Sequence, residues 1–98
     1  MAPDILLRLS GQRALLANVP PSLRAASAVL DGNCIVFRAI FDRGASPQDK
    51  ELLSIAATDI VADFPRDFSL KEEFTEIAAP ERMDHLEYVL FLRGENGA

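Results

Sequence analysis

A short turn signal, Asp31-Gly32-Asn33, constrains the fold of this chain more than any other feature, because it lies between two apolar segments. Asp-Gly favours a type I′ turn, in which both central residues need a positive φ. Residues 22–30 and 34–41 are therefore predicted to pair as an antiparallel hairpin. Side chains alternate between the two faces of a strand. One face of the second strand should then carry Ile35, Phe37, Ala39 and Phe41, and the other Val36, Arg38 and Ile40.

A helix is predicted before this hairpin. It should begin near Ile5, with Asp4 as its N-cap, and end near Ala17. Asn18 suits a left-handed residue after the helix, and Pro20-Pro21 cannot continue it. The apolar side of this helix follows an approximate stripe: Ile5, Leu6, Leu9, Arg13 and Leu16.

A second helix is predicted after the hairpin, from Ser46-Pro47 to the residue before Pro65. Serine is a favoured N-cap, and proline suits the first helical position. Its core-facing stripe has regular helical spacing and consists of Leu53, Ala56, Ala57, Ile60 and Phe64.

Two further strands are predicted over residues 69–78 and 87–93, the first with a bulge near Ile77. The high apolar content of the last strand favours a central place in the sheet. The predicted fold class is α+β, a two-layer α-β-β-α-β-β domain with a four-stranded, mostly antiparallel sheet and two helices on one face. The 98 residues should form a single domain over 1–98, with an ordered core from about 4 to 93 and a loose tail over 94–98.

Charge is distributed unevenly along the chain. Residues 1–50 hold six basic and four acidic side chains, a net +2, whereas residues 51–98 hold four basic and eleven acidic side chains, a net −7. This asymmetry predicts an acidic surface that repels nucleic acid and attracts a basic protein; a merely solubilising surface is the alternative. Ile55 is a candidate apolar anchor within that charged surface. The candidate partner-binding residues are Asp49, Leu52, Ile55, Asp59, Asp63, Asp67, Glu72, Glu73 and Glu76.

Residue types that carry catalysis or hold a metal are sparse. His85 is the one histidine and Cys34 the one cysteine, which leaves no zinc pattern and no Cys-His nucleophile in the sequence. The glycines are scattered, so no phosphate-binding loop is present. We therefore predict no catalytic residue, no metal and no cofactor, and expect that the chain is not an enzyme. A pair of carboxylates facing each other across a cleft is the alternative that would make it one.

The compartment is predicted from the cysteine content and the apolar runs. A lone cysteine fits a reducing compartment, and the first residues lack the pattern of a signal peptide. No apolar run approaches the roughly 20 residues of a membrane helix. These features predict a cytoplasmic protein that is not bound to a membrane.

Several segments together resemble a known group of proteins. They are residues 12–20, 35–42, 46–52, 60–65 and 86–93. In this combination the chain is similar, over about residues 5–95, to small bacterial immunity proteins encoded beside toxins of contact-dependent growth-inhibition and polymorphic toxin systems. The resemblance implies a cytoplasmic, non-enzymatic inhibitor that binds its toxin stoichiometrically. Members share a scaffold and differ at the surface that faces the toxin, so the resemblance carries over no contact residue.

The sequence thus predicts an immunity protein that binds and neutralises a cognate toxin through its acidic surface. The resemblance implies that the toxin is a nuclease, and an acidic protein suits such a partner because a cleft that holds phosphates must be basic. The alternative is a structural or regulatory module that self-associates through the apolar last strand together with Ile40, Ile55 and Val61.

Overall fold

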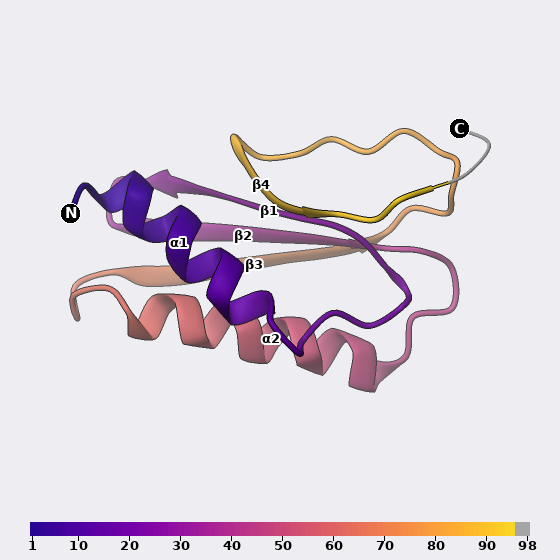
Figure 1. Cartoon of the computed structure of the whole chain (residues 1–98), viewed down its shortest axis with the longest axis horizontal. Coiled ribbons are helices and arrows are strands. Elements are labelled where there is room, and N and C mark those ends of the chain that lie inside the picture. The colour runs from indigo at the N-terminus through magenta and orange to yellow at the C-terminus, as the bar shows by residue number, and fades with distance from the viewer. Residues whose placement is uncertain (96–98) are drawn as a thin grey trace.

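A computed structural model of the chain, which describes residues 1–95, has the predicted α+β architecture (Figure 1). Two helices lie on one face of a four-stranded sheet whose strand order is β3-β2-β1-β4. The elements are α1 (Pro3–Leu15), β1 (Leu23–Asp31), β2 (Cys34–Phe41), α2 (Pro47–Ala62), β3 (Ser69–Glu76) and β4 (Tyr88–Leu92). The predicted order α-β-β-α-β-β is therefore confirmed.

The central hairpin forms where the turn signal predicts it. β1 and β2 are antiparallel, and Asp31 lies opposite Cys34, so Gly32 and Asn33 are the two residues of the loop. Gly32 has a φ of +59°, whereas Asn33 does not have a positive φ. A positive φ at the first loop residue alone is the pattern of a type II′ turn, so the predicted type I′ turn is wrong.

β3 joins the sheet parallel to β2, in an unbroken register from Cys34 opposite Ser69 to Phe41 opposite Glu76. Because α2 crosses over between these two strands, they enter the sheet from the same end. The bulge predicted near Ile77 does not form, since β3 ends at Glu76. The other two pairings, β1 with β2 and β1 with β4, are antiparallel, so the sheet is mostly antiparallel as predicted.

β4 lies at an edge of the sheet, which corrects the central position predicted for it. It has five residues and pairs only with β1. Its apolar content has another origin, because α1 packs over it: Tyr88 and Phe91 are partly buried against the core and Leu90 is buried. Val89 and Leu92 are exposed.

The helix ends follow the sequence closely in α2 and less closely in α1. Ser46 caps α2 through its side chain, which accepts a hydrogen bond from the Asp49 N–H, and Pro47 follows as predicted. In α1 the helix already begins at Pro3, Ala2 is the N-cap, and no side chain caps the end, so the predicted Asp4 cap is wrong. The left-handed residue after α1 is Ala17, with a φ of +66°, and not Asn18.

The core lies between the two helices and the sheet. The predicted inner face of β2 is buried there, as are the predicted α2 stripe residues. In α1 the predicted stripe is wrong, because the helix buries a different side: Leu7, Ser10, Gly11, Ala14 and Leu15. Gly11 allows this close approach, since a Cβ at that position would lie 2.6 Å from Leu90 Cδ1.

The opposite face of the sheet is crossed by the segment 77–87 that links β3 to β4 (Figure 1). The Leu86 N–H donates to Ser27 Oγ at 2.9 Å, and Arg38 Nη1 donates to the Asp84 carbonyl oxygen at 3.0 Å. These contacts hold the segment over β1 and β2, where Ile40 is almost fully buried.

Candidate functional site

The exposed side of α2 presents an apolar residue between two carboxylates. Ile55 lies near the middle of the helix and keeps 42% of its surface exposed. Glu51 and Asp59 are four residues before and after it, so each lies one helical turn away on the same side. Within residues 1–95 neither carboxylate takes part in an ion pair. Sequence reasoning missed Glu51, although its spacing from Ile55 was the available signal.

Asp59 and Asp63 face α1, where they line a shallow pocket with Ser10 and Arg13. Ser10 Oγ donates to Asp63 Oδ2 at 2.6 Å, and the Arg13 guanidinium pairs with the same oxygen. These bonds, that of Ser10 above all, lower the pKa of Asp63 below its ordinary value. Asp63 therefore joins the two helices, while Asp59 remains without an ion pair in the described part of the chain.

Two of the predicted residues contribute to the fold at the start and along the side of α2. The Asp49 carboxylate accepts hydrogen bonds from Ser22 Oγ at 2.8 Å and from the Ser46 N–H at 3.3 Å. The Ser22 bond is the main cause of the lowered pKa of Asp49. Leu52 is partly buried against the core.

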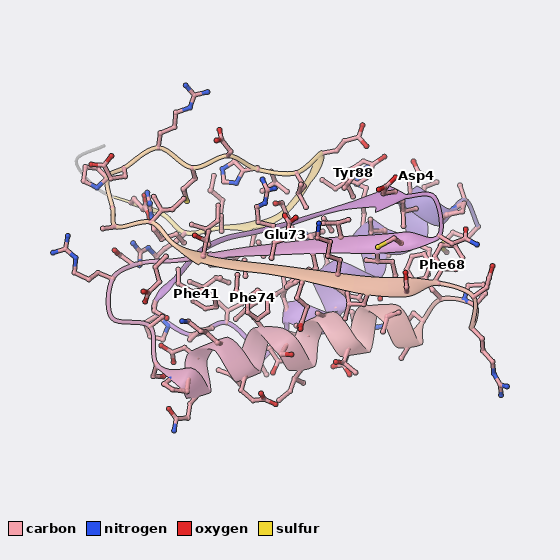
Figure 2. All side chains as sticks on the ribbon, turned by 180° about the vertical axis from the view of Figure 1, so that it is seen from behind. Asp4, Phe41, Phe68, Glu73, Phe74 and Tyr88 are labelled. Carbon is pink, nitrogen blue, oxygen red and sulfur yellow. The ribbon has the colours of Figure 1, made fainter. Side chains whose placement is uncertain are left out.

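The predicted acids of β3 divide between the two faces of the sheet by their alternation along the strand. Figure 2 shows Glu73 on the side opposite to Phe74, which lies toward the helices. Glu73 lies on the face away from the helices, where Arg38 Nη2 contacts its Oε1 at 2.8 Å and lowers its pKa. Glu72 and Glu76 have the same parity as Phe74, which packs against the core, and both are exposed. Glu76 Oε1 accepts a hydrogen bond from the Ala45 N–H at 3.2 Å.

Asp67, in the turn before β3, accepts a hydrogen bond from Asn33 Nδ2 at 2.7 Å.

The nine predicted residues do not form one continuous cluster. α2 packs against α1 on one side and against β3 on the other, so Asp59 and Asp63 are separated from Glu72 and Glu76 by the helix itself. Asp59 borders the exposed side of α2, on which Ile55 lies, whereas Glu72 and Glu76 lie beyond that side on β3.

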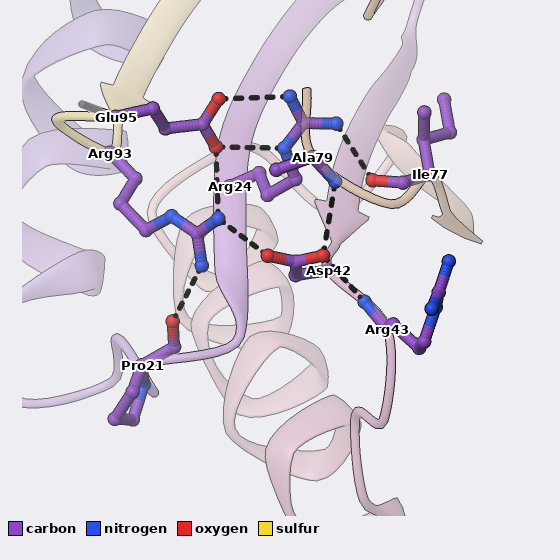
Figure 3. Close-up of polar contacts among 8 residues, drawn as sticks. All are labelled: Pro21, Arg24, Asp42, Arg43, Ile77, Ala79, Arg93 and Glu95. Atoms are coloured by element: carbon purple, nitrogen blue, oxygen red, sulfur yellow. Dashed lines mark hydrogen bonds and ion pairs between the residues drawn. The ribbon is translucent and has the colours of Figure 1, made fainter. Parts of the chain in front are cut away.

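A network of four charged residues ties the end of β4 to β1 and β2 (Figure 3). Arg24, only 2% exposed, binds Glu95 through two hydrogen bonds of 2.8 and 2.9 Å. Arg93 Nη2 lies 2.7 Å from Asp42 Oδ2 and 3.0 Å from Glu95 Oε2. The hydrogen bond from Arg24 is the main reason that the pKa of Glu95 falls to about 2, and the pKa of Asp42 is far below its ordinary range because of Arg93.

This network was not predicted, because its members are far apart in the sequence and no local pattern joins them. Glu95 falls in the predicted loose tail, and the structure places it against the buried Arg24; residues 96–98 of that tail lie outside the described residues. The charges of the four residues balance one another. The network is therefore a structural clamp rather than a surface for a charged partner.

An apolar groove runs between α1 and β4. Ile5, Leu9, Val89 and Leu92 are each between 47% and 59% exposed. The first three line the groove together with Arg8, Gln12 and Leu90. The last strand, which was predicted to take part in self-association, lines this groove through Val89 and Leu90. Ile40 cannot take part in self-association, because it is buried under the segment 77–87.

Chemical groups suited to catalysis or metal binding are dispersed in the described residues. His85 is exposed, and Cys34 is a partly buried free thiol at the start of β2. No three residues among His, Cys, Asp and Glu within 1–95 come together in a way that could hold a metal ion. In the same part of the chain, neither helix has the length and apolar content needed to cross a bilayer.

Comparison with known proteins gives one clear result. No curated protein sequence matches this chain. A family model described as MafI2 immunity protein matches residues 4–95, which extends from the first turn of α1 to the Glu95 clamp beyond β4. The match covers almost all of the chain and agrees with the immunity function predicted from the sequence resemblance. The chain therefore belongs to the MafI2 immunity protein family, and its function is immunity against a toxin.

Proposed function

We propose that this protein neutralises its toxin by binding it one to one through the exposed acidic side of α2, without catalysis, in the cytoplasm. The toxin is a basic nuclease domain, and contact-dependent growth inhibition is the setting in which it is delivered. The observation that carries the proposal is Ile55, exposed between the carboxylates of Glu51 and Asp59, neither of which has an ion pair within residues 1–95.

The arrangement has the features of a protein-binding surface. Interfaces combine an apolar centre, which loses water on binding, with a polar rim that directs the approach of the partner. A nuclease must hold phosphates in a positively charged cleft. Carboxylates without internal partners can meet that cleft at no cost to the fold, whereas those of Asp49, Asp63 and Glu73 already serve internal contacts. Inhibition then follows from occupying or covering the cleft.

The test is the rate at which the chain associates with the toxin domain encoded beside it, produced in an inactive form. The double variant Glu51→Lys/Asp59→Lys should slow association by about tenfold or more at low salt, because charge complementarity accelerates encounter. High salt should reduce the difference.

The matched control is Glu81→Lys/Asp84→Lys, on the segment that crosses the opposite face of the sheet. It changes the net charge equally, at exposed positions. Association slowed equally by both double variants would mean that only net charge matters, and unchanged association in the α2 variant would move the interface elsewhere.

A second candidate function is self-association through the groove between α1 and β4, favoured by the exposed Ile5, Leu9, Val89 and Leu92. Exposed apolar patches often mark protein interfaces. Light scattering distinguishes the candidates. A dimer that persists at high salt and is lost in Leu9→Glu favours self-association, and a monomer that binds the toxin domain favours the first proposal.

A further inference from the structure

The outer edge of β3 is open along its full length. β3 is the end strand of the sheet and pairs only with β2. The Ser69 N–H donates to the Asn33 carbonyl at 2.8 Å, and the Ile77 N–H donates to the Phe41 carbonyl at 2.9 Å. In a parallel ladder, alternate residues direct both main-chain groups to the same neighbour. The main-chain groups of the odd-numbered residues of β3 therefore bond to β2. The N–H and carbonyl groups of the even-numbered residues point outward, away from β2, at the free edge of the sheet.

The outward residues are Leu70, Glu72, Phe74 and Glu76, each with one N–H and one carbonyl group. Among residues 1–95 no other chain segment pairs with this edge. Unpaired groups in a row form a template for another strand, and proteins protect such edges with charged side chains, proline, bulges or covering segments. Of these devices β3 has the charged side chains, which disfavour a strand of like charge. β3 contains neither proline nor glycine, and its register with β2 has no bulge.

The other edge of the sheet is protected. β4 has five residues, and its register with β1 shifts between Ala26 and Ser27. The side chain of Gln12 also occupies this edge, because its Nε2 donates to the Leu90 carbonyl at 2.8 Å. The contrast identifies β3 as the edge at which a strand of another protein can be added.

The charge of β3 indicates which kind of strand would fit. Its charged residues are Lys71, Glu72, Glu73 and Glu76, a net −2. Glu73 is paired with Arg38 and Lys71 on the face away from the helices. Glu72 and Glu76 take part in no ion pair within the described chain, and both lie on the helix face. A second copy of β3 would bring like charges together, whereas a basic strand would neutralise them.

We propose that β3 accepts an extended segment of the toxin as an added fifth strand. The segment carries Lys or Arg opposite Glu72 and Glu76, and an apolar side chain opposite Phe74, whose half-buried ring lies between them. Main-chain hydrogen bonds to the outward groups supply affinity, and the alternation of acidic and apolar positions supplies specificity. This inference rests on the proposed function, since it describes how the toxin is held.

The direct test is amide hydrogen exchange of the unmodified chain, measured by NMR, alone and with the inactive toxin domain encoded beside it. In the free chain the amides of the four outward residues should exchange rapidly, while those of Lys71, Glu73 and Thr75 are already protected by β2. In the complex the outward amides should be protected by about tenfold or more. A complex in which they still exchange rapidly overturns strand addition and leaves the proposed function intact. Absence of any complex overturns both.

A matched pair of variants separates main-chain pairing from charge. Glu72→Pro removes an outward N–H and blocks the edge without breaking a bond to β2, because proline is tolerated where the N–H faces solvent. Glu72→Gln removes only the charge. Strand addition predicts that Glu72→Pro weakens toxin binding by about tenfold beyond Glu72→Gln. Equal weakening would assign the effect to charge alone and contradict the added strand. If Glu72→Pro does not fold, the exchange measurement decides.

Discussion

At the scale of single residues, internal partners distinguish the acids that hold the fold together from those that are available to a toxin. Asp49, Asp63 and Glu73 were all predicted as contact residues, and each has a lowered pKa because a side chain of the same chain donates to it. Composition and helical spacing can identify a carboxylate, but they cannot show which Ser or Arg the fold will place beside it. Among the predicted residues of α2, Ile55 and Asp59 are exposed, whereas Asp49 and Leu52 are partly buried.

Replacement of Asp63 tests its structural role. Asp63→Ala leaves Ser10 Oγ, which is only 1% exposed, without its acceptor and removes the partner of Arg13. We expect the free energy of unfolding, measured in urea, to fall by about 1–2 kcal/mol. Asp59→Ala is the control, since Asp59 lines the same pocket without an ion pair in the described residues, and should change stability by less than about 0.5 kcal/mol. Equal losses of unfolding free energy in the two variants would show that the bonds of Asp63 to Ser10 and Arg13 add no stability of their own.

Glu95 predicts how stability depends on pH. Its pKa in the folded chain, about 2, lies below the ordinary 4.5, because Arg24 and Arg93 donate to the charged form. The carboxylate therefore stabilises the fold fully above about pH 4.5, and this contribution is lost as the pH falls toward 2. In urea titrations at several pH values, Glu95→Gln should be less stable than the wild type at pH 7 and should lose less stability between pH 4.5 and 2. Parallel pH profiles for variant and wild type would contradict this.

At the scale of elements, local signals predicted where the hairpin and α2 begin and end better than they predicted the exact turn type or the ends of α1. The turn at Gly32 and the cap at Ser46 depend on a few neighbouring residues, and both elements form where the sequence places them. The side of α1 that faces the core depends on α2 and β4. Contact with them buries Leu7 and Ala14 and leaves Ile5 and Leu9 exposed.

The edge position of β4 has a similar explanation. The apolar run of β4 is compatible with a strand covered on both sides or with an edge strand packed under a helix, and only the placement of α1 decides between them. The parallel alignment of β3 likewise follows from the crossover through α2, which no residue of β3 encodes alone.

The cap of α2 offers a quantitative test at this scale. The side chain of Ser46 accepts a hydrogen bond of 3.0 Å from the Asp49 N–H, and Asp49 in turn accepts from the Ser46 N–H. Ser46→Ala should lower the free energy of unfolding by about 1 kcal/mol. The control is Ser54→Ala in the interior of the same helix, which should be neutral or slightly stabilising, because alanine is the better helix former. Thermal unfolding of both variants gives the comparison, and a neutral Ser46→Ala would mean that the capping box is dispensable.

At the scale of the whole molecule, the scaffold divides into surfaces of different character. One side carries the apolar groove of α1 and β4, where the edge of the sheet is closed by Gln12. The other side carries α2 with its unpaired carboxylates and the open edge of β3. The net −7 of residues 51–98 predicts an acidic surface, but the sequence could not predict which acids the fold would pair with basic side chains. The fold pairs Asp63, Glu73, Asp84 and Glu95 with basic side chains and leaves the other acids of residues 51–95 without an ion pair.

The most direct test of this account is a titration of the nuclease activity of the toxin domain with the purified chain. The account predicts complete inhibition at one equivalent by the wild type and by Glu81→Lys/Asp84→Lys. It also predicts that several equivalents of Glu51→Lys/Asp59→Lys, with unfolding behaviour like that of the wild type, are needed for the same inhibition. Full inhibition at one equivalent by the α2 variant, or no inhibition by the wild type at any ratio, would contradict the claim that the acidic side of α2 neutralises a nuclease toxin.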